Sequence, residues 1–179
     1  GTIGLATIES LKAMGASKVF VIQRKSVRQE YAKNSGADAV LDPAECDVVA
    51  EVMRLTDGHG ADIAFECTGA QACFDQEVAA VHAGGTVVVT SIWEKGVSFD
   101  LNALVIPEKK IVGSICYCGN DFDDVIRLMD EGKIPANGFI TKKVALDDIV
   151  SEGFETLTGP EKKKQVKILV SANPDELGA

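Results

Sequence analysis

Two glycines open the chain at a spacing that suits a phosphate-binding turn. Gly1 and Gly4 lie three residues apart and precede an apolar pattern at helical spacing. In the dinucleotide motif G-x-G-x-x-G, one glycine lets the backbone approach a pyrophosphate and another lets the helix pack on its strand. Gly1, Thr2, Ile3 and Gly4 therefore match the second half of that motif, with helix N–H groups facing the pyrophosphate. A plain turn before a helix would contain the same glycine pair.

A cationic loop follows the next β-rich run, about 20 residues after the glycines, where such folds select the ribose. An NAD-selective site places a carboxylate there, which accepts the ribose hydroxyls and repels a 2′-phosphate. This position holds Gln23, followed by Arg24 and Lys25, with Arg28 one turn further on. The missing carboxylate and the added phosphate donors favour NADP. NAD stays open because Gln23 could bind a plain ribose, and the cations could be solvated loop charges.

Two more loops follow apolar β-runs. Residues 67–69 come after the run 63–65, and residues 90–92 come after the run 86–89. Ligands of open α/β sheets bind at the carboxyl ends of the strands, so both loops are candidates to touch a cofactor. Cys67 is interpreted as a small buried hydrophobe rather than a nucleophile, because no histidine accompanies it in a motif. The candidates in these loops are Cys67, Thr68, Gly69, Thr90, Ser91 and Ile92.

The sequence shows no pattern typical of a zinc site or of a catalytic residue that transfers a proton. Cys116 and Cys118 are separated by one residue, whereas structural zinc sites favour C-x₂₋₄-C and need further ligands. The chain's two histidines sit in contexts that suggest no site: His59 lies between glycines, and His82 is expected at a helix end. No Ser/His/Asp order with a nucleophile elbow is present. We therefore assign no catalytic residue and no metal ligand within this chain.

The elements that position these residues alternate between strand and helix. Short β-branched runs are expected to be strands at 18–22, 39–41, 63–65, 86–91 and 111–116. Helical segments separate them, with Ser26 and Gln29 spaced as a capping box, Asp47 as an N-cap, and Gly15 and Gly36 as C-terminal caps. This alternation predicts a Rossmann-like, doubly wound parallel α/β sheet. No strand precedes Gly1, so the first, central strand of that sheet is missing and the chain looks like part of a longer enzyme.

The rhythm changes after about residue 113. Apolar residues at helical spacing predict helices over 122–129 and 146–157, and 165–170 is expected to be a last strand before a polar tail. We therefore divide the chain into a dinucleotide-binding domain at 1–113, a C-terminal segment at 114–171 and a tail at 172–179.

Composition excludes several classes of protein. The chain has 179 residues, a net charge of −9 and 46% hydrophobic residues, so it can bury a core and is not disordered. The acidic balance argues against nucleic acid and anionic membranes as partners, and no apolar run approaches the roughly 20 residues that span a bilayer. Five cysteines without dense spacing suggest reduced thiols, so a cytoplasmic location is expected.

These motifs come in an order that resembles the carboxyl half of the zinc-dependent, medium-chain alcohol/polyol dehydrogenases, and within them most closely the 2,3-butanediol dehydrogenases. The resemblance covers the chain up to about Ser171. Its supporting segments are GTIGLA at 1–6, GASKV at 15–19, ADIAFECTG at 61–69, GGTVVV at 84–89, SIWEK at 91–95, GSICY at 113–117 and VKILV at 166–170.

The resemblance implies a function and a set of roles. Gly1 and Gly4 would carry the pyrophosphate loop, residues 23–25 the ribose end, and residues 68–69 and 90–92 the nicotinamide side. Hydride would pass between NADP or NAD and a secondary alcohol or diol such as 2,3-butanediol, with acetoin as the ketone. The zinc ligands of the family lie upstream of Gly1. Residues 114–171 would return to the catalytic domain, and a homo-oligomer, a dimer or tetramer, would form through strands such as 111–116. The chain alone is expected to be inactive.

Two other functions remain open at this stage. One is a zinc-free medium-chain reductase acting on quinones or enones, and the other is a non-enzymatic NAD(P)-binding module that senses redox state. The fold is compatible with all three functions, because a fold does not by itself determine the chemistry.

Overall fold

Helices and strands alternate along the chain in the computed structural model, which describes residues 1–136, 138–173 and 175. The strands are β1 (Phe20–Ile22), β2 (Ala39–Leu41), β3 (Ala61–Glu66), β4 (Val81–Val89), β5 (Lys110–Gly113), β6 (Ile140–Ala145) and β7 (Lys167–Ser171). The α-helices are α1 (Thr2–Ala13), α2 (Arg28–Asn34), α3 (Val48–Leu55), α4 (Gln71–Ala80), α5 (Asn102–Val105), α6 (Gly119–Asp130) and α7 (Glu155–Thr158). Three further turns of helix are η1 (Leu146–Asp148), η2 (Ile149–Phe154) and η3 (Pro160–Lys164).

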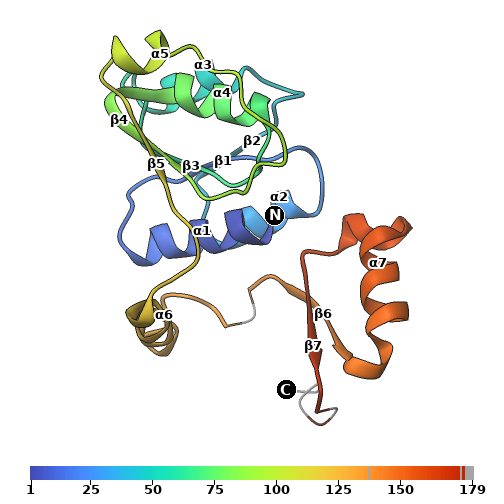
Figure 1. Cartoon of the computed structure of the whole chain (residues 1–179). Coiled ribbons are helices and arrows are strands. Elements are labelled where there is room, and N and C mark those ends of the chain that lie inside the picture. The colour runs from blue at the N-terminus through green and yellow to red at the C-terminus, as the bar shows by residue number, and fades with distance from the viewer. Residues whose placement is uncertain (137, 174, 176–179) are drawn as a thin grey trace.

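Parallel pairing and two helical layers confirm the predicted doubly wound α/β fold. Strand β1 pairs with β2, and β3, β4 and β5 pair in that order, all in parallel. Helices α1 and α2 lie on one side of these strands and α3 and α4 on the other (Figure 1). Parallel strands covered on both faces read as continuous apolar runs, which is why the sequence reveals them.

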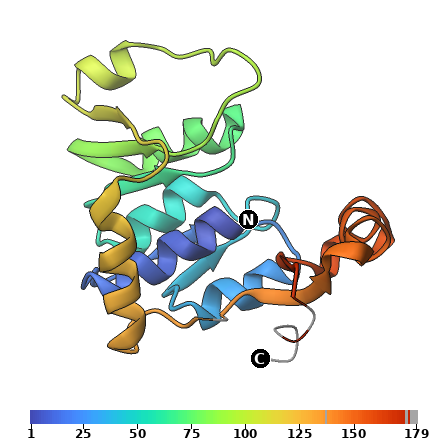
Figure 2. The same ribbon diagram turned by 60° about the horizontal axis from the view of Figure 1, so that its bottom comes forward.

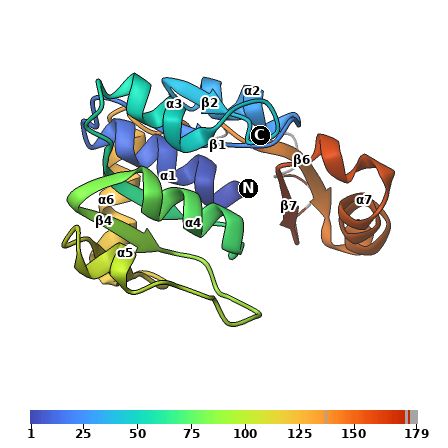
Figure 3. The ribbon, with the colours of Figure 1, turned by 90° about the horizontal axis from the view of Figure 1, so that it is seen from above.

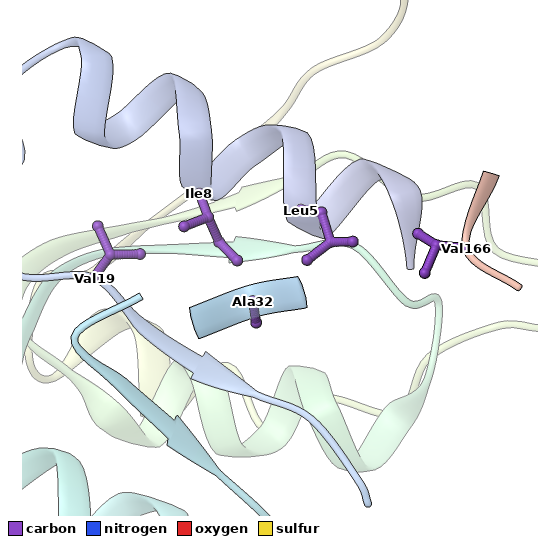
Figure 4. Packing of buried hydrophobic residues seen from close by; sticks show 5 residues of the cluster. All are labelled: Leu5, Ile8, Val19, Ala32 and Val166. Atoms are coloured by element: carbon purple, nitrogen blue, oxygen red, sulfur yellow. The ribbon is translucent and has the colours of Figure 1, made fainter. Parts of the chain in front are cut away.

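The alternation of side chains along β1 shows how both faces are buried. Val19 and Val21 pack with Leu5 and Ile8 of α1, whereas Phe20 and Ile22 point to the opposite face, beside the side chains of α3. Figure 4 shows Leu5 and Ile8 pointing from α1 toward the strands and α2, with Ala32 below them and Val19 and Val166 at the two ends of the cluster. This cluster connects the first helix to the segment before β7.

The sheet is interrupted between β1 and β3, where the sequence predicts that a central strand is missing. These two strands are each the last of their sheet, with no ladder between them among the described residues. A cavity of about 700 Å³ lies along this gap, lined by residues 19–22 on one side, 61–65 on the other, and the buried side of α1. It runs from the amino ends of the strands, at His59 and Asp62, to their carboxyl ends, at Gly1 and Thr68.

The C-terminal part differs from the prediction in two ways. The helix expected over 146–157 is helical throughout, but its hydrogen-bond pattern changes from η1 through η2 to α7, and Gly153 is buried within η2. Strand β6 was not predicted, because Thr141, Lys142 and Lys143 interrupt its apolar pattern, yet it pairs in parallel with β7. Strand β7 starts two residues later than expected. Most of the predicted tail 172–179 lies outside the described residues.

The elements after β5 lie around the first unit rather than in its sheet. Figure 2 shows α6 on the same side as α1, and Figures 1 and 3 both show β6, β7 and α7 to one side of the doubly wound unit. No residue of α6 is buried among the described residues. Within the same residues, no helix combines the length and apolarity needed to cross a membrane.

The predicted helix caps are partly correct. Asp47 caps α3 by accepting a hydrogen bond from the Ala50 N–H at 3.1 Å, and Gly15 and Gly36 have the left-handed φ values of 92° and 101°. The capping box at Ser26 and Gln29 is wrong. The Gln29 amide instead donates to the Gln23 carbonyl oxygen at 2.9 Å, because the chain folds back there from β1 into α2.

A close approach between β3 and β4 depends on a glycine. A Cβ atom at Gly85 would lie 2.8 Å from the Asp62 carbonyl oxygen and 3.1 Å from the His82 carbonyl oxygen, and it would overlap the Val81 side chain. We expect Gly85→Ala to lower the free energy of unfolding by about 1–3 kcal/mol, because the strands must separate. Denaturant unfolding measures this change.

The matched control is Gly96→Ala, since a Cβ atom there meets nothing within 4 Å. An equal loss of stability in both variants would show that the strand contact is not the cause.

Candidate functional site

The amino end of α1 faces open space at the carboxyl edge of the sheet. Gly1 is its N-cap and provides no side-chain cap, so the first N–H groups of the helix are left for a ligand. A Cβ atom at Gly1 or Gly4 would meet nothing within 4 Å. Ile3 is 59% exposed, and the Thr2 hydroxyl is already used, since it donates to the Val166 carbonyl oxygen at 3.1 Å.

The loop after β1 is held in shape by an acid that the sequence did not single out. Asp42, only 5% exposed, directly follows β2, and its carboxylate accepts the Lys25 N–H at 2.7 Å and the Ala44 N–H at 2.9 Å. The Gln23 amide donates to the Arg24 carbonyl oxygen at 3.0 Å. The side chains of Arg24 and Lys25 stay exposed at the end of the strand, available to a phosphate.

Arg28 lies deeper than the rest of this cationic group. Its Nη2 donates to the Gln165 carbonyl oxygen at 3.4 Å, next to the Val166 carbonyl that Thr2 contacts. Within the described part of the chain, its Nε is buried and has no hydrogen-bond partner. Arg28 therefore lies toward the amino end of α1, where a phosphate would provide the missing acceptor.

A buried carboxylate joins the two loops that follow β3 and β4. Glu66, at the end of β3, is fully buried and accepts hydrogen bonds from the Thr68 N–H at 2.7 Å, the Thr68 hydroxyl at 2.6 Å and the Gly69 N–H at 2.9 Å. Its other oxygen accepts from the Ser91 hydroxyl. Burial by itself would raise the pKa of Glu66, but these donors outweigh it and hold the pKa below its usual range.

Further contacts bring the same two loops close together. The Thr90 hydroxyl donates to the Glu66 carbonyl oxygen at 2.8 Å and to the Cys67 sulfur at 3.4 Å. Gly69 has φ of 66°, and a Cβ atom there would lie 3.2 Å from the Ile92 carbonyl oxygen. The Ile92 side chain itself is 81% exposed.

The predicted residues therefore gather at one edge, although not around one surface. Gly1, Gly4, Gln23, Cys67 and Thr68 line the cavity between β1 and β3. Thr90 and Ser91 position the loops through Glu66, while Arg24, Lys25 and Ile92 project outward. The open helix end and the unpartnered Arg28 Nε suit a dinucleotide phosphate, so the residues fit NADP or NAD.

The described residues do not supply a zinc site beside this cofactor site. The one cluster among them whose atoms could hold a metal ion is His59, Asp62 and His82. It lies at the amino ends of β3 and β4, whereas the candidate cofactor residues lie at the carboxyl ends.

Comparisons with known proteins show the family to which this chain belongs. A sequence profile of the family described as zinc-binding dehydrogenase matches residues 2–131, and the chain belongs to this family. The chain is 42% identical to an (R,R)-butanediol dehydrogenase of Neisseria gonorrhoeae, over 97% of this chain and 48% of that protein. It is 36% identical to an L-threonine 3-dehydrogenase of Pyrococcus abyssi, over 94% of this chain and 49% of that protein.

A solved structure matches as well. The crystal structure of 2R,3R-butanediol dehydrogenase from Bacillus subtilis matches with a TM-score of 0.89 and 42% identity, covering 97% of this chain and 49% of that one. The predicted resemblance is confirmed, and the chain spans about half the length of the relatives it matches.

A second buried acid, Glu77, faces the cavity but, in the described part of the chain, lacks the hydrogen-bond donors that surround Glu66. Glu77 of α4 is 9% exposed, and its Oε2 has no hydrogen-bond partner within the described residues. Burial, and then the negative charge of Glu66, raise the pKa of Glu77 to about 8. Its side chain is therefore neutral over much of the pH range in which Glu66 is charged.

This raised pKa predicts a pH-dependent stability. The stability that the protonated Glu77 contributes to the folded state is fully present below its ordinary pKa of 4.5. It is lost as the pH rises through about 8, because the folded state must then hold an unpaired charge. We expect Glu77→Gln to unfold with a free energy about 1–3 kcal/mol higher than the parent at about pH 9, and with little difference at about pH 4. Urea unfolding across this range measures it.

Asp75→Asn is the matched control, since Asp75 lies on the same helix but is exposed. Parallel pH profiles for the parent and Glu77→Gln would contradict the assignment.

Proposed function

We propose that this chain is the cofactor-binding half of a zinc-dependent oxidoreductase that transfers hydride between NAD(P) and a secondary alcohol or diol such as 2,3-butanediol. The observation that supports this most strongly is the convergence of the α1 amino end and the loops after β1, β3 and β4 at one edge of the sheet. The (R,R)-butanediol dehydrogenases at 42% identity favour a diol or its hydroxyketone as the substrate.

Each part of the edge has a role in this proposal. The N–H groups at the start of α1 bind the pyrophosphate, and the Arg28 guanidinium adds a positive charge beside them. The loops held by Glu66 orient the nicotinamide ring and exclude water from its face. The bound cofactor supplies the hydride acceptor, and we expect the zinc and its ligands in residues outside this chain.

We further propose that the cofactor is NADP rather than NAD. Arg24 and Lys25 are exposed at the end of β1, and Asp42 fixes the backbone between them without turning its carboxylate to solvent. A 2′-phosphate would meet two cations here and no exposed carboxylate in the place where NAD-selective sites carry one.

The experiment assays the whole protein with 2,3-butanediol and acetoin in the presence of each cofactor, for the parent and for Arg24→Ala. We expect turnover in the parent, and we expect Arg24→Ala to weaken NADP binding by about 1.5–3 kcal/mol while NAD binding changes little. Fluorescence titration with each reduced cofactor measures the two affinities.

Lys33→Ala serves as the control, because it removes an exposed cation from the far end of α2. Equal loss for both cofactors would reject NADP selectivity, and absence of turnover with any alcohol or ketone would reject the function.

We also propose that two copies associate through β5 and the segments beside it. Strand β5 is an edge strand, and apolar residues around it are exposed, among them Val112 at 48%, Val105 at 67% and Ile115 at 74%. An apolar edge with unpaired backbone groups is a ready surface for pairing with a second chain.

Ile111→Lys should therefore shift the whole protein toward a monomer, because a buried lysine would oppose the strand contact. Sedimentation velocity measures the mass, and Lys110→Gln is the control on the same strand. If Ile111→Lys sediments as the parent does, the contact lies elsewhere.

A further inference from the structure

Two histidines and an aspartate meet at the amino edge of the sheet, away from the cofactor site. His59 lies in the loop before β3, Asp62 in β3, and His82 in β4. Asp62 Oδ1 is 3.3 Å from His82 Nε2 and 3.6 Å from His59 Nε2, and one ligand atom of each residue lies within 4.8 Å of the others. The sequence expected His82 at a helix end, so it did not bring these residues together.

The orientation of His82 leaves one ring nitrogen directed at the carboxylate. Its Nδ1 lies 2.5 Å from the Ala83 carbonyl oxygen. Because a carbonyl oxygen only accepts, Nδ1 must carry the hydrogen, and Nε2 of the neutral ring then faces Asp62 with a lone pair. A proton on Nε2 would join the ring to Asp62 as an ion pair, and a metal ion bound by both atoms would join them in the same way. Metal-binding histidines are commonly oriented in this way by a backbone carbonyl.

A single metal ion can bind the ligand atoms of all three residues at once. The imidazole rings of His59 and His82 have centroids 4.5 Å apart, and the ligand atoms of the two rings lie within 4.8 Å of each other and of Asp62. Tetrahedral zinc has bonds of about 2.0–2.1 Å to nitrogen and oxygen, which gives edges of about 3.3–3.4 Å between ligand atoms. The two distances to Asp62 are close to such edges.

The backbone holds the ligands in place before any ion binds. Gly60 has φ of 91°, its N–H donates to the Thr56 hydroxyl at 2.9 Å, and a Cβ atom there would lie 2.9 Å from the Ala80 carbonyl oxygen. The loop that carries His59 is therefore tight against the start of β4. The pairing of β3 with β4 shifts register between Ala61 and Ile63, and such irregularities re-aim side chains.

We propose that His59, Asp62 and His82 bind one divalent transition-metal ion, with zinc as the expected occupant, and that this ion fastens the α3–β3 loop to β4. Two nitrogen ligands and one oxygen ligand favour zinc over magnesium or calcium, which prefer oxygen alone. The side chain of Asp62 is 83% exposed, so water completes the coordination. The site is separate from the zinc of the proposed dehydrogenase reaction, and it does not depend on that function.

The test is a titration of the chelator-treated full chain with Co²⁺, followed by competition with Zn²⁺. We expect the parent to bind one Co²⁺ per chain more tightly than His59→Ala does, with visible absorption typical of nitrogen and oxygen ligands, in addition to any ion at the separate zinc site of the proposed reaction. We also expect a higher midpoint of thermal unfolding with Zn²⁺. His59→Ala should weaken binding by roughly tenfold or more, and the midpoint increase should disappear with it. Binding should also weaken as the pH falls, because the imidazoles become protonated.

Two further variants keep the outcome interpretable. His82→Gln removes a second ligand and retains a side chain of similar size, so it separates lost binding from lost folding when its circular dichroism matches the parent. Asp57→Asn removes a charge from the same loop without removing a ligand, and it should bind like the parent.

Three results would overturn the proposal. The first is the absence of stoichiometric binding, and the second is equal affinity in the parent, His59→Ala and His82→Gln. The third is a thiolate-to-cobalt charge-transfer band, which would assign the ion to the free cysteines.

Discussion

The carboxylate of Glu66 is the interaction on which the candidate cofactor edge depends. A fully buried charge is costly unless its oxygens are satisfied, and here donors from Thr68, Gly69 and Ser91 satisfy them. Since these donors begin two different loops, the acid cannot remain charged in the interior unless both loops take this conformation. The conformation of the loops after β3 and β4 thus follows from the need of the buried Glu66 carboxylate for hydrogen-bond donors.

Asp42 and Glu77 show how the same residue class acts in other surroundings. Asp42 is nearly as buried as Glu66, and it uses its oxygens to hold backbone N–H groups of the loop after β1. Glu77 has few donors and faces the cavity, so its pKa moves in the opposite direction. Both Asp42 and Glu66 stand where a strand ends, which makes an acid after an apolar run a useful sequence signal.

The sequence predicts the strands of the doubly wound unit well because their periodicity has a physical cause. Strands covered on both faces need uninterrupted apolar residues, and β2 is found at the predicted bounds. Strand β6 was not predicted because Thr141, Lys142 and Lys143 interrupt its apolar pattern. Apolar spacing predicts the helix over 146–157 but does not reveal its change from η1 through η2 to α7. The contact between His59 and His82 was not predicted for another reason. The two residues lie 23 positions apart in the chain, and only the pairing of β3 with β4 brings them together.

The interrupted sheet has a mechanical consequence. Within the described residues, no continuous ladder joins the β1–β2 sheet to the β3–β4–β5 sheet. The twist between these two sheets therefore depends on the side chains that pack against α1 and at the end of α4. Such packing yields to shear more easily than backbone hydrogen bonds do. An extended segment lying between β1 and β3 would pair with both strands, and it would join the two sheets through backbone hydrogen bonds.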